Sequence, residues 1–120
     1  MKVRGVRGAT TVERNRAEDI LHETEVLLKE IVNVNEIEPD DIASVFITVS
    51  PDLNATFPAR AIRSMPGWKF VPLMCGQEIP VPNGLPRCIR LMILVNTHKR
   101  ADHIQHVYLN EAVSLRPDLS

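Results

Sequence analysis

The sequence predicts an α+β domain in which one long helix packs against one face of a mixed β-sheet. One segment carries apolar residues at helical spacing, and several short segments have the composition of strands and are separated by turns rich in proline and glycine. These helices are too few to cover both faces of a sheet, which argues against a doubly wound α/β fold. The length of 120 residues indicates a single domain over residues 1–120.

A first strand is expected at residues 2–8, where two glycines indicate a β-bulge or the close approach of another backbone. Arg4 and Arg7 are three positions apart, so they fall on opposite faces of an undistorted strand. One of them could bind a ligand while the other is structural or solvated, and the spacing does not say which.

The long helix is predicted to begin after Asn15, a suitable N-cap residue with Glu18 at the capping-box distance, and to continue to about residue 33. Its buried stripe consists of residues that repeat at helical spacing: Ile20, Thr24, Leu27, Leu28 and Ile31. Acidic residues lie off this stripe. We therefore expect a packing helix with a solvated acidic face and assign it no chemistry.

The middle of the chain predicts two strands with a short helix between them. The first strand covers residues 43–50, the helix covers residues 58–65, and the second strand covers residues 68–74. Pro72 indicates that this second strand is an edge strand or contains a bulge. The two arginines of the short helix are expected to face solvent or to border a neighbouring pocket.

Residues 88–95 are nearly all apolar, which predicts a fully buried strand. Arg90 is the exception, and a buried charge without a partner is costly, so its guanidinium must face a carboxylate, a ligand or water. Glu78, across a proline-rich turn, is the nearest acid in the sequence. Two interpretations follow: a structural Arg90–Glu78 ion pair, or two side chains that point into a polar pocket and meet a substrate between them.

The last part of the chain predicts a short helical turn within residues 98–105, a short strand at residues 106–109, and either helix or strand at residues 111–115. It contains three histidines: His98, His103 and His106. No two of them have the spacing of a metal-binding pair on one helix face, and no acid is clearly placed to complete a site. We therefore expect no metal ion.

The net charge of −1 argues against a nucleic acid or a membrane surface as partner. Residues 13–41 hold ten acids and three bases, whereas the rest of the chain is rich in arginine, which suggests a small anionic ligand. The first residues do not resemble a signal peptide, and no apolar run reaches the length of a membrane span. We expect a cytoplasmic protein in which Cys75 and Cys88 are free thiols.

The predicted helices leave part of the sheet uncovered. One long helix cannot bury the apolar strand at residues 88–95 on both sides. The open face of the sheet is therefore expected to mediate self-association, most simply as a closed ring of identical chains.

The chain contains a series of short motifs in a defined order: Arg4-Gly-Val-Arg7-Gly-Ala-Thr-Thr-Val-Glu13, Pro51-Asp-Leu, Phe57-Pro-Ala59, Cys75-Gly-Gln-Glu78, Cys88-Ile-Arg90, His106-Val-Tyr108-Leu and Leu115-Arg116-Pro-Asp-Leu119. Their joint order and spacing resemble the monofunctional, Bacillus-type chorismate mutases over essentially the whole chain. The resemblance implies a chorismate-mutase-like fold with ferredoxin-like topology. It also implies a homotrimer with a barrel-like core and three active sites at the subunit interfaces.

The resemblance further implies conversion of chorismate to prephenate, at the branch point towards phenylalanine and tyrosine, by a rearrangement that needs no cofactor. In such a site Arg90 donates to the ether oxygen, where negative charge develops, and Glu78 accepts from the ring hydroxyl. Arg7 binds a carboxylate, Tyr108 forms a hydrogen bond near the side-chain carboxylate, and Cys75 contacts the ring hydroxyl. The adjacent subunit would supply the rest of the lining, with Arg116 near the mouth of the site: Phe57, Arg63, Leu73, Met74 and Leu115.

One residue departs from the family pattern, because Met74 stands where a smaller or hydroxylated residue is expected; its backbone could still bind the ligand. Two alternative functions suit a protein of similar shape. One is a trimeric module that binds a small anion without transforming it. The other is an imine-deaminase-like enzyme, whose chemistry would need an activated water.

Overall fold

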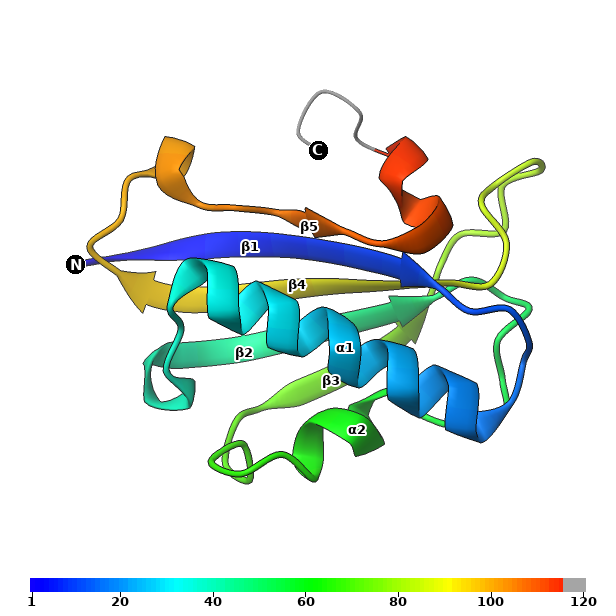
Figure 1. The fold of residues 1–120 in the computed structure, drawn as a ribbon, viewed down its shortest axis with the longest axis horizontal. Helices are drawn as coiled ribbons and strands as arrows, with labels where there is room; N and C mark the ends of the chain where they lie inside the picture. The colour runs from blue at the N-terminus through cyan, green and yellow to red at the C-terminus, as the bar shows by residue number, and fades with distance from the viewer. Residues whose placement is uncertain (116–120) are drawn as a thin grey trace.

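The computed structural model describes residues 1–115, which form a five-stranded sheet with helices packed on one face (Figure 1). The strand order is β3-β2-β4-β1-β5, with these bounds: β1 Lys2–Thr11, β2 Ile42–Val49, β3 Leu73–Gln77, β4 Cys88–Thr97 and β5 Val107–Tyr108. The two α-helices are α1 (Ala17–Asn35) and α2 (Ala59–Arg63). The predicted α+β class with a mixed sheet is confirmed.

Strand β4 occupies the centre of the sheet and pairs antiparallel with both β1 and β2. Strand β5 lies parallel to β1 at one edge, and β3 lies parallel to β2 at the other. β1 and β2 therefore run in the same direction on either side of β4, and α1 connects them across one face of the sheet (Figure 1). This arrangement brings residues from the two ends of the chain together beside β4.

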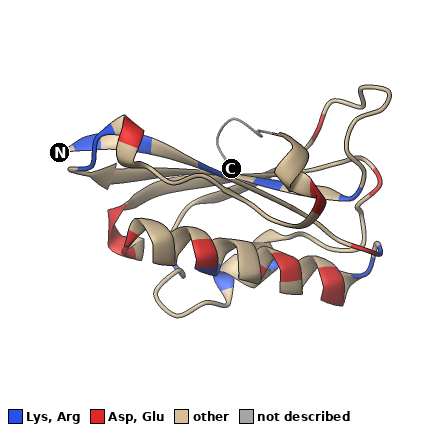
Figure 2. Ribbon diagram, turned by 45° about the horizontal axis from the view of Figure 1, so that its top comes forward, with Lys and Arg blue, Asp and Glu red and all other residues tan. Residues whose placement is uncertain are grey.

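Helix α1 packs close to β1 because that strand has a glycine where the two elements meet. A methyl group on Gly8 would collide with Cδ1 of Ile31 and would lie 3.3 Å from Cδ1 of Leu27. The buried residues of α1 are the predicted stripe together with Asn35. Side chains of α1, rather than the backbone of another element as predicted, make the close approach at Gly8. Acidic residues recur along the helix (Figure 2).

The start of α1 differs from the prediction. Arg16 is the N-cap residue, and it makes no side-chain hydrogen bond to the helix. The prediction of Asn15 as the N-cap is wrong because its side chain has other partners: its Oδ1 accepts the N–H groups of Asn54 and Ala55, each at 3.1 Å. Asn15 therefore fastens the loop after β2. The helix also ends later than predicted, before Glu36 in the left-handed conformation with φ of 54°.

Strand β3 begins later than the prediction of a strand at residues 68–74. Trp68 is only 2% exposed and lies in the core, but the residues from there to Pro72 form turns and irregular backbone. Pro72 precedes the strand, and its carbonyl oxygen accepts the N–H of Val45 at 2.9 Å. Cys75 consequently lies within β3, and Glu78 directly follows it. Helix α2 is likewise shorter than predicted.

Strand β4 is buried on one side only. Its odd-numbered residues from Ile89 to Val95 are buried, whereas Arg90 and Met92 point to the opposite face and are exposed. The prediction of a fully buried strand is wrong, because within residues 1–115 this second face is covered only at its start, where Cys88 is buried, and is left open at Arg90 and Met92. The prediction that the helices leave one sheet face open is confirmed.

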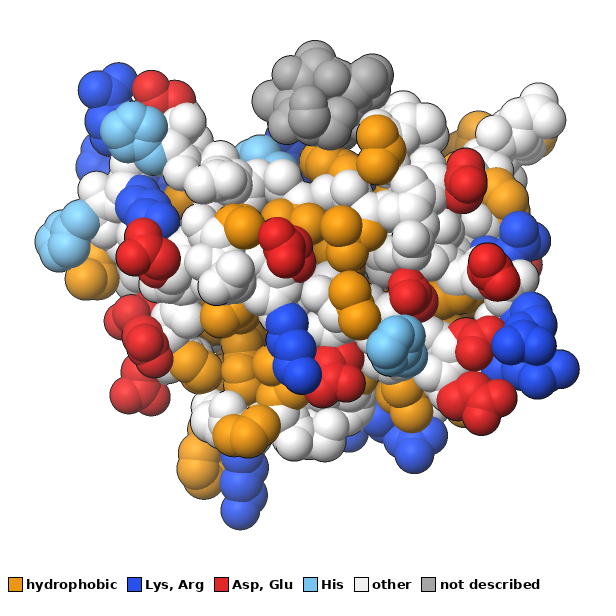
Figure 3. Space-filling view, in the orientation of Figure 1, with side chains coloured by type: hydrophobic (Ala, Val, Ile, Leu, Met, Phe, Trp, Pro, Cys, Tyr) orange, Lys and Arg blue, Asp and Glu red, His pale blue; other side chains and the backbone are white. Residues whose placement is uncertain are grey.

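Three short 3₁₀ helices complete the described chain: η1 (Pro39–Asp41), η2 (Ala101–His103) and η3 (Asn110–Leu115). The last of them resolves the ambiguous segment after β5, which is helical. The helix-covered side presents acidic and basic side chains among small apolar areas, as expected of a solvated surface (Figure 3). None of the helices that the structure describes has the length and apolar character needed to cross a membrane.

Candidate active site

Four strands place residues in one row across the open face of the sheet. Arg90 of β4 pairs with Thr48 of β2 on one side and with Ala9 of β1 on the other. Ala9 in turn pairs with Tyr108 of β5. Paired residues point to the same side of a sheet, so this row joins segments that are far apart in the sequence. Arg7 lies in the next row on the same face of β1.

A pocket of about 250 Å³ opens over this row. Its lining combines two arginines, a carboxylate and a tyrosine with apolar residues: Arg7, Gly8, Ala9, Phe46, Thr48, Glu78, Arg90, Leu91, Met92 and Tyr108. Arg7 is therefore the arginine of β1 that faces the pocket. Arg4 lies on the opposite face, where its Nε donates to the carbonyl oxygen of Lys99 at 3.2 Å. The prediction that Arg4 and Arg7 face opposite sides is confirmed.

Glu78 and Arg90 form an ion pair in this pocket, with 2.7 Å between Oε1 of Glu78 and Nε of Arg90. Their side chains are 29% and 46% exposed, respectively, so neither charge is deeply buried in the single chain. The backbone N–H of Glu78 donates to the carbonyl oxygen of Val49 at 2.8 Å, which fixes the carboxylate beside the end of β2. A guanidinium carries five N–H donors, so a pair made through Nε leaves donors for a ligand oxygen.

Cys88 lies near the ion pair and is 1% exposed. Burial raises the pKa of its thiol, although the Arg90 guanidinium opposes this effect. The thiol is therefore neutral at neutral pH. Glu78, rather than a thiolate, is the anion that orients Arg90.

The start of β4 is held by a hydrogen-bond network that involves Asp52, in the loop after β2. The Asp52 carboxylate accepts the N–H of Arg87 at 2.9 and 3.1 Å, and it accepts the hydroxyl of Ser50. The Ser50 oxygen accepts the N–H of Cys88 at 2.8 Å. Arg87 has a φ of 48°, a conformation that a non-glycine residue keeps only where its surroundings hold it. In the sequence, Pro51-Asp52 indicates only a turn.

Strand β5 is held at both ends by asparagines. Asn35 accepts the N–H of Gln105 through Oδ1 and donates through Nδ2 to the carbonyl oxygen of the same residue, both at 2.8 Å. Asn110 donates to the hydroxyl of Thr10 at 3.0 Å. Because β5 has only two residues, these side-chain hydrogen bonds add to its short backbone pairing with β1 and help to hold Tyr108 at the pocket. Neither asparagine is marked as functional by its sequence context.

The predicted site residues of β3 lie outside this pocket. Strand β3 pairs with β2 so that Met74 shares the open face of the sheet. Leu73 and Cys75 have register partners whose side chains are buried on the helix-covered face. The register therefore separates Cys75 from Arg90 within one chain.

Three further predicted residues of the described chain are also absent from the pocket. Phe57, which precedes α2, is 69% exposed, and Arg63 at the end of α2 is exposed as well. Leu115 ends η3 and does not line the pocket. Arg116 lies outside the described residues.

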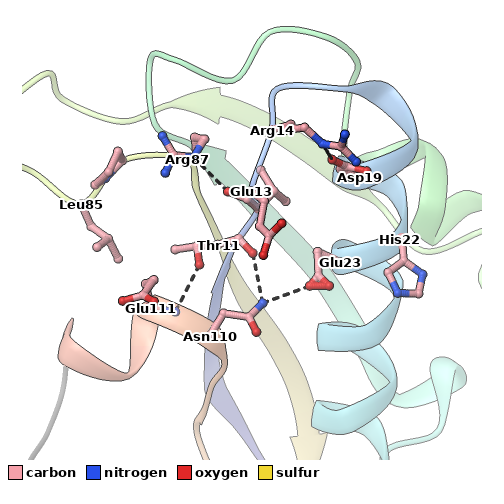
Figure 4. Close-up of a pocket in the computed structure, with 12 residues that line it drawn as sticks. Thr11, Glu13, Arg14, Asp19, His22, Glu23, Leu85, Arg87, Asn110 and Glu111 are labelled. Carbon is pink, nitrogen blue, oxygen red and sulfur yellow. Dashed lines mark hydrogen bonds and ion pairs between the residues drawn. The ribbon is translucent and has the colours of Figure 1, made fainter.

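A larger hollow of about 700 Å³ lies at the start of α1 (Figure 4). Its lining holds more acids than arginines. Two of these acids have partners within the hollow: Asp19 lies 3.3 Å from Nε of Arg14, and Glu23 accepts a hydrogen bond from Asn110 at 3.0 Å. An acidic hollow of this kind repels an anion. Within residues 1–115, no group of three histidine, cysteine or acidic side chains is arranged to hold a metal ion.

The fold and the pocket together define a small α+β protein with a charged pocket on an open sheet, in which arginines face a carboxylate, a residue set suited to an anion. The family model described as chorismate mutase type I matches residues 3–119. The chain therefore belongs to the type I chorismate mutase family, a family of isomerases, which confirms the family predicted from the motifs.

Individual relatives match over nearly their whole length. The chorismate mutase AroH of Bacillus subtilis (strain 168) is 49% identical over 120 residues, which cover 100% of this chain and 94% of the relative. The chorismate mutase AroH of Thermus thermophilus is 48% identical over 118 residues, 98% of this chain and 96% of the relative. The solved structure of a chorismate mutase from Clostridium thermocellum superimposes with a TM-score of 0.89 at 52% identity, over 92% of this chain and 97% of that one.

Proposed function

We propose that this protein converts chorismate to prephenate in the pocket on the open sheet face. The observation that carries the proposal is the meeting of Arg90, Glu78, Arg7 and Tyr108 in one cavity, from segments that span most of the chain. Two arginines supply the charge that a dicarboxylate substrate requires. The relatives are named chorismate mutases, and we therefore take chorismate as the proposed substrate.

The proposed reaction is an intramolecular [3,3] rearrangement of an enol ether. One C–O bond breaks while one C–C bond forms, so atoms and electrons balance without a co-reactant. The protein has to hold a compact conformer and stabilise the charge that develops as the C–O bond breaks. Arg90 donates to the ether oxygen, Glu78 accepts from the ring hydroxyl, and Arg7 and Tyr108 bind carboxylate oxygens.

We also propose a homotrimer with a barrel-like core, built from single-domain chains of ferredoxin-like topology. Phe46 and Met74 on the open face are 43% and 65% exposed, and a second chain packed there would cover them. That chain would also supply the lining that the described pocket lacks, Phe57, Arg63, Leu73, Met74 and Leu115, with Arg116 near the mouth of the site. Cys75 keeps its proposed role as a contact of the ring hydroxyl. Both cysteines are free thiols, which suits the reducing cytoplasm where we place the protein.

The geometry favours rearrangement over the hydrolysis of an imine. Glu78 lies 2.7 Å from the Arg90 guanidinium, so its carboxylate is engaged with a cation rather than placed to hold a water. A binding module without chemistry would leave its ligand intact, and turnover separates that alternative from an enzyme.

The test is a spectrophotometric assay with purified protein and chorismate. We expect the ultraviolet absorbance of the chorismate diene to disappear at a rate proportional to the protein concentration, with prephenate as the product. The rate should be saturable, and no metal or cofactor should be needed. Binding of chorismate without loss of absorbance would contradict the proposed function and favour the binding module.

A further inference from the structure

We propose that His106 is a positioning residue that holds Arg7 and Tyr108 where both can bind the carboxylates of the substrate. The inference rests on the proposed function and adds a residue to it. His106 does not line the pocket, so it would act through its neighbours rather than through the substrate.

The contact that carries the inference is a hydrogen bond from the backbone N–H of Arg7 to Nδ1 of His106, at 2.9 Å. The parallel pairing of β1 with β5 covers only Gly8 with Val107 and Ala9 with Tyr108. The imidazole therefore continues this short ladder by one position, and a side-chain nitrogen takes the place of a backbone carbonyl oxygen. It joins the two residues that flank the pairing, Arg7 and His106.

This hydrogen bond defines the protonation state of His106. A neutral imidazole has one donor nitrogen and one acceptor nitrogen, so the nitrogen that accepts from Arg7 carries no proton, and Nε2 carries it. If Nδ1 were protonated, its N–H would point at the backbone N–H of Arg7, and no hydrogen bond could form between two donors. Without an acceptor, the half-buried N–H of Arg7 would have to find another partner or shift the strand.

The neighbouring attachments of β5 do not depend on His106. The side chain of Asn35 forms hydrogen bonds with both the N–H and the carbonyl oxygen of Gln105. The N–H of Leu109 donates to the carbonyl oxygen of Ala9 at 2.9 Å. Loss of the imidazole should therefore leave β5 attached and free only the segment between these points. That segment carries Tyr108, and its partner segment on β1 carries Arg7.

The expected kinetic effect is on substrate affinity. Arg7 and Tyr108 would bind carboxylates, which carry the same charge in the ground state and in the transition state. Loss of such uniform binding raises KM and leaves kcat nearly unchanged, whereas loss of Arg90 would lower kcat. A general loss of folded protein would instead lower the apparent kcat at constant KM.

The test compares two substitutions of nearly equal shape, His106→Leu and His106→Asn. Leucine removes the acceptor, whereas the Oδ1 of asparagine can accept the N–H of Arg7 in its place. We expect His106→Leu to raise KM for chorismate by about tenfold, the usual effect of one lost hydrogen bond, with kcat within about twofold of the unmodified protein. His106→Asn should restore KM to within about threefold. The matched control is His103→Leu, which removes an exposed imidazole from η2.

Equal KM values for the leucine and asparagine variants would overturn the positioning role, and so would a fall in kcat at constant KM in both. Failure of the unmodified protein to consume chorismate would contradict the proposed function itself, which is a different outcome. A second measurement needs no variant: ¹⁵N spectra of the folded protein should show Nδ1 of His106 without a proton, because that nitrogen accepts the N–H of Arg7. A proton on Nδ1 would overturn the inference.

Discussion

Arg90 has its Nε 2.7 Å from Glu78, while 46% of its side chain remains exposed. An ion pair with this degree of exposure contributes at most about 1 kcal/mol to folding stability. A donor aimed at developing negative charge is worth about 3–4 kcal/mol of activation free energy. The guanidinium should therefore matter far more for the rate of reaction than for folding.

Replacement of Arg90 tests this difference. We expect Arg90→Ala to lower kcat by about 10²–10³, because the ether oxygen loses its donor, while the midpoint of thermal unfolding changes by only a few degrees. Initial rates with chorismate and calorimetry measure the two quantities. Arg100→Ala is the matched control, since its ion pair with Asp102 is on the surface. A fully active Arg90→Ala protein would remove this residue from the mechanism.

The secondary-structure elements position the site through a few tight contacts. Helix α1 can lie close to β1 only because Gly8 has no side chain, and that strand carries Arg7 on its other face. The loop after β2 uses Asp52 to hold the backbone of Arg87, three residues before Arg90. Rigid neighbours of this kind keep catalytic groups within the small tolerance that catalysis allows.

A methyl group at Gly8 should disturb the packing of α1 on the sheet. Because it would collide with Cδ1 of the fully buried Ile31, we expect Gly8→Ala to lower the free energy of unfolding by about 1–3 kcal/mol. Urea titration followed by circular dichroism measures the change. Gly76→Ala is the control, since a methyl group there meets no atom within 4 Å. Equal stability of the two variants would show that α1 can move away from β1 without cost.

The whole molecule presents two faces of different character. The helix-covered face is solvated and mixed in charge (Figure 3). The open face places apolar residues such as Phe46 and Met92 beside the arginines of the pocket. An apolar surface next to a pocket is typical of a site that two chains build together.

A carboxylate introduced on each face in turn should distinguish the proposed interface from the solvated surface. Phe46 and Val26 have similar exposure, 43% and 40%, but lie on the open face and on α1, respectively. We expect Phe46→Asp to convert a trimer into monomers, because a carboxylate cannot be buried in an apolar interface without a partner. Val26→Asp should leave the trimer intact. Sedimentation velocity measures both, and a trimeric Phe46→Asp protein would contradict assembly through the open face.

The pattern of residues along the chain was sufficient to predict which segments are helices or strands and to select candidate site residues. Helical spacing located α1, alternation located β2, and the cation in an apolar strand directed attention to Arg90 and its partner Glu78. Boundaries were less well predicted where one side chain had a distant partner. Asn15 looked like an N-cap and instead binds the loop at Asn54 and Ala55.

Local periodicity and composition determine the α+β class, the long packing helix and the open sheet face, because each of these is encoded in residues close together in the chain. The order of the motifs along the whole chain determines the chorismate mutase family. Strand register decides the rest. It selects Arg7 rather than Arg4 for the pocket, places Cys75 away from Arg90, and sets His106 against the backbone of Arg7. Contacts between segments nearly a chain length apart depend on how strands align, and no local pattern contains that alignment.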